Sequence, residues 1–290
     1  MGAKTKIDWC DSTWNPVTGC LHDCPYCYAR RIAERFGGCW RLDLPPDTSW
    51  RGNVGVRELM GDYARHSNGK CHVLDEPEIE CDAIDPPSGY RGKVKPYPYS
   101  FDPTFHRYKL GEPQRWKKPR TIFVCSMADL FGDWVPDEWI QKIFEACDKA
   151  SQHRYMFLTK NPSRYAELLN LLPKHRRPPN VAEMWFGQSF TGAERNYTPL
   201  ALPPWQYRFA SIEPLLRNLS RAEAMEIAAT NEWSIVGAET GVRKGKIIPK
   251  REWVENIVEA AQITGMKIFM KDSLRELMGT DFRQEFPWEG

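Results

Sequence analysis

Short apolar runs recur through the second half of the chain at intervals close to the length of one strand–helix unit. Six runs, 121–125, 155–159, 184–188, 207–211, 233–237 and 267–271, begin 34, 29, 23, 26 and 34 residues apart. One βα unit takes about 30 residues, and strands buried on both faces of a parallel sheet are nearly continuous in apolar residues. The spacing therefore predicts a parallel α/β fold and excludes a series of short hairpins.

Helical patterns lie between several of these runs. The segment 137–150 has the period of an amphipathic helix and begins after a proline. Its apolar face consists of Trp139, Ile143, Phe144 and Cys147. Further helices are expected at 163–172 and 250–263, and residues 14–18 are expected to supply a first strand.

Seven expected strands with intervening helices fit a partial or near-complete (β/α) barrel of parallel strands. An open doubly wound sheet has the same local pattern and is the alternative. We predict one domain over residues 1–290 with a long irregular insertion at about 38–115, which is rich in Pro, Gly and charge. Cys39, Cys71 and Cys81 belong to this stretch and are expected to be free thiols, with a second metal centre as the alternative.

Three of the nine cysteines lie within eight residues, as Cys20, Cys24 and Cys27. An odd number of cysteines in a long chain favours metal binding or catalysis over a disulfide framework. Three thiolates from one loop indicate an iron–sulfur cluster with one open iron, and an open coordination position indicates chemistry. There are two alternatives. One is a zinc site with His22 as a ligand, and the other is a redox-active pair of cysteines.

The C-x3-C-x2-C spacing, with Tyr26 before the last cysteine, resembles the signature of radical S-adenosylmethionine (radical SAM) enzymes. The resemblance implies that Cys20, Cys24 and Cys27 hold a [4Fe–4S] cluster whose open iron binds S-adenosylmethionine. It implies reductive cleavage of S-adenosylmethionine to a 5′-deoxyadenosyl radical, which abstracts hydrogen from a substrate. It also implies that Tyr26 lies near the adenine and that a reductase or flavodoxin-type protein donates the electron.

A second resemblance extends over most of the chain, to a poorly characterised radical-SAM-like family of phages and bacteria. Many members of that family space the first two cysteines more widely, whereas this chain has the spacing of the superfamily. The stretches that carry the resemblance are IDWCDSTWNPVTGC, KPRTIFVCSMADLF, FLTKNPSRYAELL, SIEPLL and SIVGAETG.

Polar residues follow the expected strands at their carboxyl ends, where parallel barrels build their active sites. The resemblance implies that Ser126 and Asp129 contact the amino group of S-adenosylmethionine, and that Gly237 and Glu239 belong to an adenine-side motif. Gln188 and Ser189 are candidates for its ribose or carboxylate. The candidate catalytic residues, expected to face the substrate, are Lys160, Glu213 and Lys271.

The chain has 40 Lys and Arg residues against 38 Asp and Glu residues, which excludes a uniformly basic surface like that of a histone. Local basic clusters occur at 115–120, 174–177 and 243–246, and there are 12 Trp residues. Basic groups beside aromatic rings can hold phosphates and stack bases, so a nucleic acid or nucleotide, modified or repaired, is the substrate hypothesis. The alternative function is a zinc-stabilised nucleic-acid-binding protein without catalysis.

Two further features concern the location of the protein. No apolar run approaches the ~18 residues of a membrane helix. The first residues, MGAKTKIDW, lack the apolar core of a signal peptide. We therefore expect a cytoplasmic protein without membrane partners.

Overall fold

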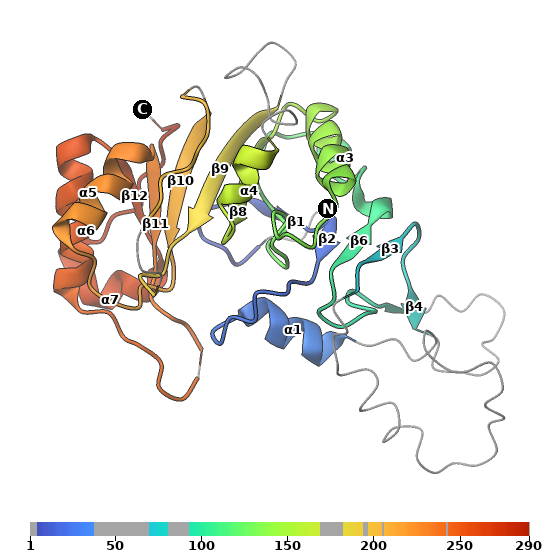
Figure 1. Ribbon diagram of the computed structural model, residues 1–290, viewed down its shortest axis with the longest axis horizontal. Helices are drawn as coiled ribbons and strands as arrows, with labels where there is room; N and C mark the ends of the chain where they lie inside the picture. Colours follow the sequence, from blue (N-terminus) through green and yellow to red (C-terminus); the bar gives the residue numbers. More distant parts are fainter. Residues whose placement is uncertain are drawn as a thin grey trace.

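The computed structural model describes residues 5–37, 70–80, 93–168, 182–193, 197–204, 206–241 and 243–289 (Figure 1). Seven parallel strands form the main sheet, in the order β1-β7-β8-β9-β10-β11-β12. These strands are β1 (Ser12–Trp14), β7 (Thr121–Val124), β8 (Arg154–Thr159), β9 (Glu183–Ser189), β10 (Tyr207–Ile212), β11 (Trp233–Val236) and β12 (Lys267–Met270).

The strand order decides between the two predicted architectures. A doubly wound sheet reverses its strand order at a switch point, whereas here each later strand joins the same edge of the sheet. Figure 1 shows the sheet curving from β1 to β12, with β1 and β12 at opposite edges. The predicted partial (β/α) barrel is therefore confirmed, in the form of a half-barrel.

The first strand is shifted from its expected position at 14–18. β1 ends at Trp14, and Val17–Thr18 forms β2, which pairs with β6 (Thr104–His106) in a separate three-stranded sheet. β3 (His72–Leu74) is the third strand of that sheet. Pro16 lies between β1 and β2, and because proline has no N–H group it cannot continue a ladder of hydrogen bonds.

Helices cover the two halves of the main sheet separately (Figure 1). α3 (Asp137–Asp148) and α4 (Ser163–Glu167) pack on β7, β8 and β9 through one buried cluster that includes Ile140, Phe144 and Phe157. A second cluster joins β10, β11 and β12 to α5 (Arg221–Thr230), α6 (Arg251–Thr264) and α7 (Arg275–Met278). The expected helices at 137–150 and 250–263 are confirmed. The helix expected at 163–172 begins at Ser163 but already ends at Glu167, and residues 169–172 lie outside the described part of the chain.

The described parts of the stretch 38–115 are more ordered than the sequence predicted. They contain β3, β6, β4 (Ile79–Glu80), β5 (Lys93–Val94) and two 3-10 turns, Arg107–Lys109 and Pro113–Arg115. Phe105 of β6 is fully buried and stacks on Trp139 of α3 with ring centroids 5.1 Å apart. This contact joins the end of the stretch to the main body of the fold.

The three cysteines of that stretch have different outcomes. Cys39 and Cys81 lie outside the described residues. Cys71 is an exposed free thiol that donates to the carbonyl of Trp134 at 3.1 Å, which agrees with the expectation for this residue.

Inside the half-barrel, a layer of aromatic side chains closes one end of the interior, and this layer is here called the aromatic floor. Trp9, Phe123, Trp185, Phe209 and Trp233 belong to this interior cluster. The carboxyl-terminal residues close the floor from outside, where Trp288 packs against Trp185 and Trp233 and lies under the Arg154 guanidinium at 3.9 Å. Ligands therefore reach the interior from the opposite end, at the carboxyl ends of the strands.

Within the described ranges, none of the helices has both the length and the apolar character needed to span a membrane.

Candidate active site

A cavity of about 500 Å³ opens at the carboxyl ends of the strands, above the aromatic floor. This size is ordinary for a small-molecule site. Alternate residues of a strand point to the same face, so β8 places Met156 in the floor and Lys160 in the cavity wall. The predicted residues that line the cavity are Cys20, Cys24, Tyr26, Cys27, Ser126, Asp129, Lys160, Ser189, Glu213, Glu239 and Lys271.

The loop that carries the three cysteines, residues 20–27, is here called the cysteine loop. It enters the cavity between the main sheet and the three-stranded sheet. Gly19 donates its N–H to the carbonyl of Met127 at 2.9 Å, and Cys20 donates to the carbonyl of Phe101 at 3.1 Å. Gly19 has a φ of +88°, and a Cβ there would lie 2.1 Å from the carbonyl oxygen of Asp102, so only glycine fits. The loop ends where Cys27 Sγ accepts from the N–H of Arg30 and caps α1 (Tyr28–Phe36).

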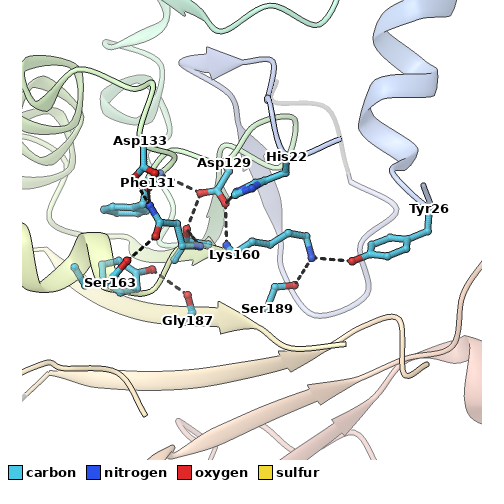
Figure 2. Close-up of polar contacts among 12 residues, drawn as sticks. His22, Tyr26, Asp129, Phe131, Asp133, Lys160, Ser163, Gly187 and Ser189 are labelled. Atoms are coloured by element: carbon cyan, nitrogen blue, oxygen red, sulfur yellow. Dashed lines mark hydrogen bonds and ion pairs between the residues drawn. The ribbon is translucent and has the colours of Figure 1, made fainter. Parts of the chain in front are cut away.

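A buried carboxylate connects the cysteine loop to the sheet. Asp129 is 5% exposed, and its Oδ2 lies 2.7 Å from Nε2 of His22, which is in the middle of the loop (Figure 2). The same carboxylate accepts from Thr159 Oγ1 at 2.7 Å and from the backbone N–H groups of Lys160 and Phe131. These hydrogen bonds use both oxygens of Asp129 to join the loop to the ends of β7 and β8.

The thiols of the loop are partly buried. Burial raises the pKa of Cys20 to about 12. Burial also raises the pKa of Cys24, and the Lys160 ammonium lowers it by a smaller amount. The thiols of Cys20 and Cys24 on their own are therefore protonated at neutral pH, and a metal would replace their protons. Among the described residues, no three His, Cys, Asp or Glu side chains converge closely enough to hold a single metal ion.

Lys160 extends from the end of β8 across the cavity (Figure 2). Its Nζ donates to Ser189 Oγ at 3.2 Å and to the hydroxyl of Tyr26 at 3.3 Å, and it lies 5.3 Å from the centre of the Tyr26 ring. The side chain thus places a cation next to the cysteine loop, between two hydroxyl groups.

An ion pair crosses the opposite wall of the cavity. Lys271 Nζ donates to Glu213 Oε1 at 2.6 Å, and both side chains are about a quarter exposed, at 22% and 25%. The two residues follow β12 and β10, so the pair passes over Gly237 at the end of β11. A Cβ at Gly237 would lie 3.1 Å from Lys271 Cδ and 3.3 Å from Glu213 Cδ. Gly237 therefore makes room for the ion pair.

Glu239 also has a partner outside the predicted set. It is 5% exposed, and Arg243 binds both carboxylate oxygens, at 2.6 and 2.7 Å. These hydrogen bonds lower the pKa of Glu239, so this carboxylate is charged. The pair fixes the loop between β11 and α6. The sequence analysis placed Arg243 only in the basic cluster 243–246 and so did not predict its pairing with Glu239.

Of two other predicted residues, Ser126 and Gln188, only the first lines the cavity. Ser126 lines the cavity, and its Oγ donates to Asn15 Oδ1 at 3.1 Å. Gln188 does not line the cavity and is 3% exposed, because it alternates with Ser189 and faces the helices. Tyr28 was not predicted, yet it lines the cavity beside Cys27 and its hydroxyl donates to the carbonyl of Ser126 at 2.7 Å.

A family model described as a protein of unknown function, DUF5131, matches residues 4–58 and 80–276. The chain belongs to the DUF5131 family. No curated protein sequence matches this DUF5131 protein.

Solved structures similar to this DUF5131 protein include spore photoproduct lyase, a radical SAM enzyme. A cysteine-to-serine variant of the lyase matches with a TM-score of 0.50 and 10% identity, covering 93% of this chain and 79% of the lyase chain. A cysteine-to-alanine variant with dinucleoside spore photoproduct matches equally, with a TM-score of 0.50, 10% identity, and coverage of 93% and 79%. At 10% identity these similarities concern the fold, and they agree with the predicted partial barrel of parallel strands.

Proposed function

We propose that this protein is a radical SAM enzyme whose Cys20, Cys24 and Cys27 hold a [4Fe–4S] cluster. The observation that carries the proposal is the position of the three cysteines. All three line one cavity at the carboxyl ends of the parallel strands, together with eight other residues that the sequence analysis named as candidates for the site. In parallel barrels this end of the strands carries the chemistry.

The donor set fits such a cluster. Three thiols from one short loop face one cavity, and each is a free cysteine of intermediate exposure. In a cluster, each cysteine binds a different iron, so the three sulfur atoms do not need to converge on a single point. Once bound with S-adenosylmethionine, the cluster would supply the electron that generates a radical able to take hydrogen from a substrate.

The residues around the cavity would position the ligands. Lys160 presents its ammonium beside Tyr26 and Ser189, where it would hold an anionic group of a ligand. The pair of Glu213 and Lys271 offers adjacent acceptors and donors to a polar substrate. The aromatic floor beneath them keeps water from entering through the other end of the half-barrel.

For the substrate, we propose a nucleic acid or a nucleotide. Aromatic side chains line the cavity and give a planar base faces on which to stack. The similar lyase was solved with a dinucleoside spore photoproduct, which supports a ligand of this size and chemistry.

The proposal is tested by assembling the cluster anaerobically and measuring cleavage of S-adenosylmethionine. Reduced wild-type protein with roughly four irons should produce 5′-deoxyadenosine. Cys24→Ala should lose both iron and cleavage, because it removes one of three ligands. Cys71→Ala removes an exposed thiol outside the loop and should retain both.

Two results would contradict the proposal. One is cleavage of S-adenosylmethionine by Cys24→Ala at the wild-type rate. The other is a colourless wild-type protein that binds stoichiometric zinc through the same cysteines, which would favour a zinc-stabilised nucleic-acid-binding protein.

A further inference from the structure

The structure separates the basic clusters of the sequence by their position. Residues 115–120 come directly before β7, so they lie at the amino end of the strand, away from the cavity. The cluster at 174–177 lies outside the described residues. The cluster at 243–246 follows Ala238, Glu239 and Thr240, which line the cavity, so it lies beside the cavity mouth.

This loop meets the helix that follows the cysteines. Figure 1 shows the loop between β11 and α6 projecting from the sheet at the same end as α1. A Cβ at Gly241 would lie 3.4 Å from Nη2 of Arg31, so the loop touches the Arg31 guanidinium. The contact brings Arg31 to the loop that carries Arg243, Lys244 and Lys246, and these four residues are here called the basic rim.

Most of the positive charge of the basic rim is not neutralised. Arg243 is paired with Glu239, and that pair holds the loop in place. Arg31, Lys244 and Lys246 are exposed and make no ion pair within 4 Å with any described residue, and Lys246 is also attracted by the Glu239 carboxylate. Neighbouring cations repel one another, and a bound polyanion would relieve this repulsion.

We infer that the basic rim binds the phosphate backbone of a single nucleic acid strand whose target base enters the cavity. This inference rests on the proposed function and, of the two substrates proposed there, selects the nucleic acid over the free nucleotide. Tyr26, Tyr28 and Phe101 line the cavity, so a base extruded from the strand would find aromatic partners inside. The phosphates on either side of that base would remain at the mouth, where the cations are.

The test measures binding of a fluorescein-labelled single-stranded oligonucleotide at salt concentrations from about 50 to 200 mM. Lys244→Ala/Lys246→Ala removes two exposed cations of the basic rim. The affinity should fall by roughly tenfold, and the slope of log affinity against log salt should decrease by about 1.4, or about 0.7 for each lost phosphate contact. Circular dichroism establishes that the variant is folded.

Lys117→Ala/Lys118→Ala is the matched control, because it removes two exposed lysines at the opposite end of the sheet and should bind like the wild type. The inference is overturned if the two double variants bind equally well, or if the wild type has no salt-dependent affinity for the oligonucleotide. Formation of 5′-deoxyadenosine by the wild type without oligonucleotide is measured separately. Cleavage without such binding rejects the basic rim alone, and binding without cleavage rejects the proposed function alone.

Discussion

At the scale of single residues, the hydrogen bond between His22 and Asp129 holds the middle of the cysteine loop against the sheet. The buried Asp129 carboxylate joins the loop to β7 and β8, and the His22 ring also packs edge-on against Trp134, with centroids 4.9 Å apart. Mutation of a residue that orients metal ligands without binding the metal itself typically weakens metal affinity by about 10- to 100-fold. His22 is therefore a positioning residue in this account.

His22→Phe keeps a ring against Trp134 but removes the hydrogen bond to Asp129. We expect the reconstituted variant to lose iron to a chelator about tenfold faster than the wild type. His72→Phe is a suitable control, since His72 also pairs with an aspartate, Asp102, and stacks on Tyr99, but lies in β3. Equal rates of iron loss for the two variants would mean that the bond to Asp129 has no positioning role.

Which residues of the site were predictable depended on their distance along the chain. The three cysteines share one loop, so their spacing alone brought them together. The bond between His22 and Asp129 joins residues 107 positions apart, and no local pattern predicts it. Gln188 and Ser189 were both candidates because the sequence did not reveal which neighbour faced the cavity, and a shift of one residue reverses the face of a strand.

At the scale of secondary-structure elements, α5 shows how a helix with a weak sequence signal is stabilised. Ser220 and Glu223 form a reciprocal capping box, and Arg217 donates to both oxygens of Glu223, at 3.0 and 2.6 Å. These hydrogen bonds lower the pKa of Glu223 from 4.5 to about 2. The charged carboxylate therefore contributes to the stability of the fold.

The sign of the pH dependence follows from this shift. The folded-state pKa is below the unfolded value, so the contribution is complete above about pH 4.5 and is lost as the pH falls toward 2. Glu223→Gln should lower the free energy of unfolding by about 1–3 kcal/mol at pH 7, and by much less near pH 3. Denaturant unfolding at both pH values measures this, with the exposed Glu226→Gln in the same helix as the control. A loss of equal size at both pH values would show that the charge of Glu223 is not its source.

Three elements that were not predicted, α5, β2 and β6, lack a long periodic pattern. α5 is rich in alanine and has few large apolar residues, so its sequence has no clear amphipathic face. β2 and β6 have two and three residues, too few for an alternating pattern. The six later strands of the main sheet were predicted because each is a nearly continuous apolar run, as burial on both faces requires.

At the scale of the whole molecule, the two ends of the half-barrel are different. Aromatic residues of the floor and the carboxyl-terminal Trp288 close one end. The cysteine loop, Lys160 and the pair of Glu213 and Lys271 surround the open end. The repeat of apolar runs predicted this polarity, because all strands are parallel and their carboxyl ends lie at the same edge.

We propose that the cysteine loop at the open end holds an iron–sulfur cluster. Anomalous diffraction at the iron absorption edge, on crystals of the anaerobically reconstituted protein, would locate the bound iron. We predict an iron peak in the cavity, in contact with the sulfur atoms of Cys20, Cys24 and Cys27. Iron bound elsewhere in the protein, or a peak at these cysteines at the zinc edge alone, would show that the loop does not hold an iron–sulfur cluster.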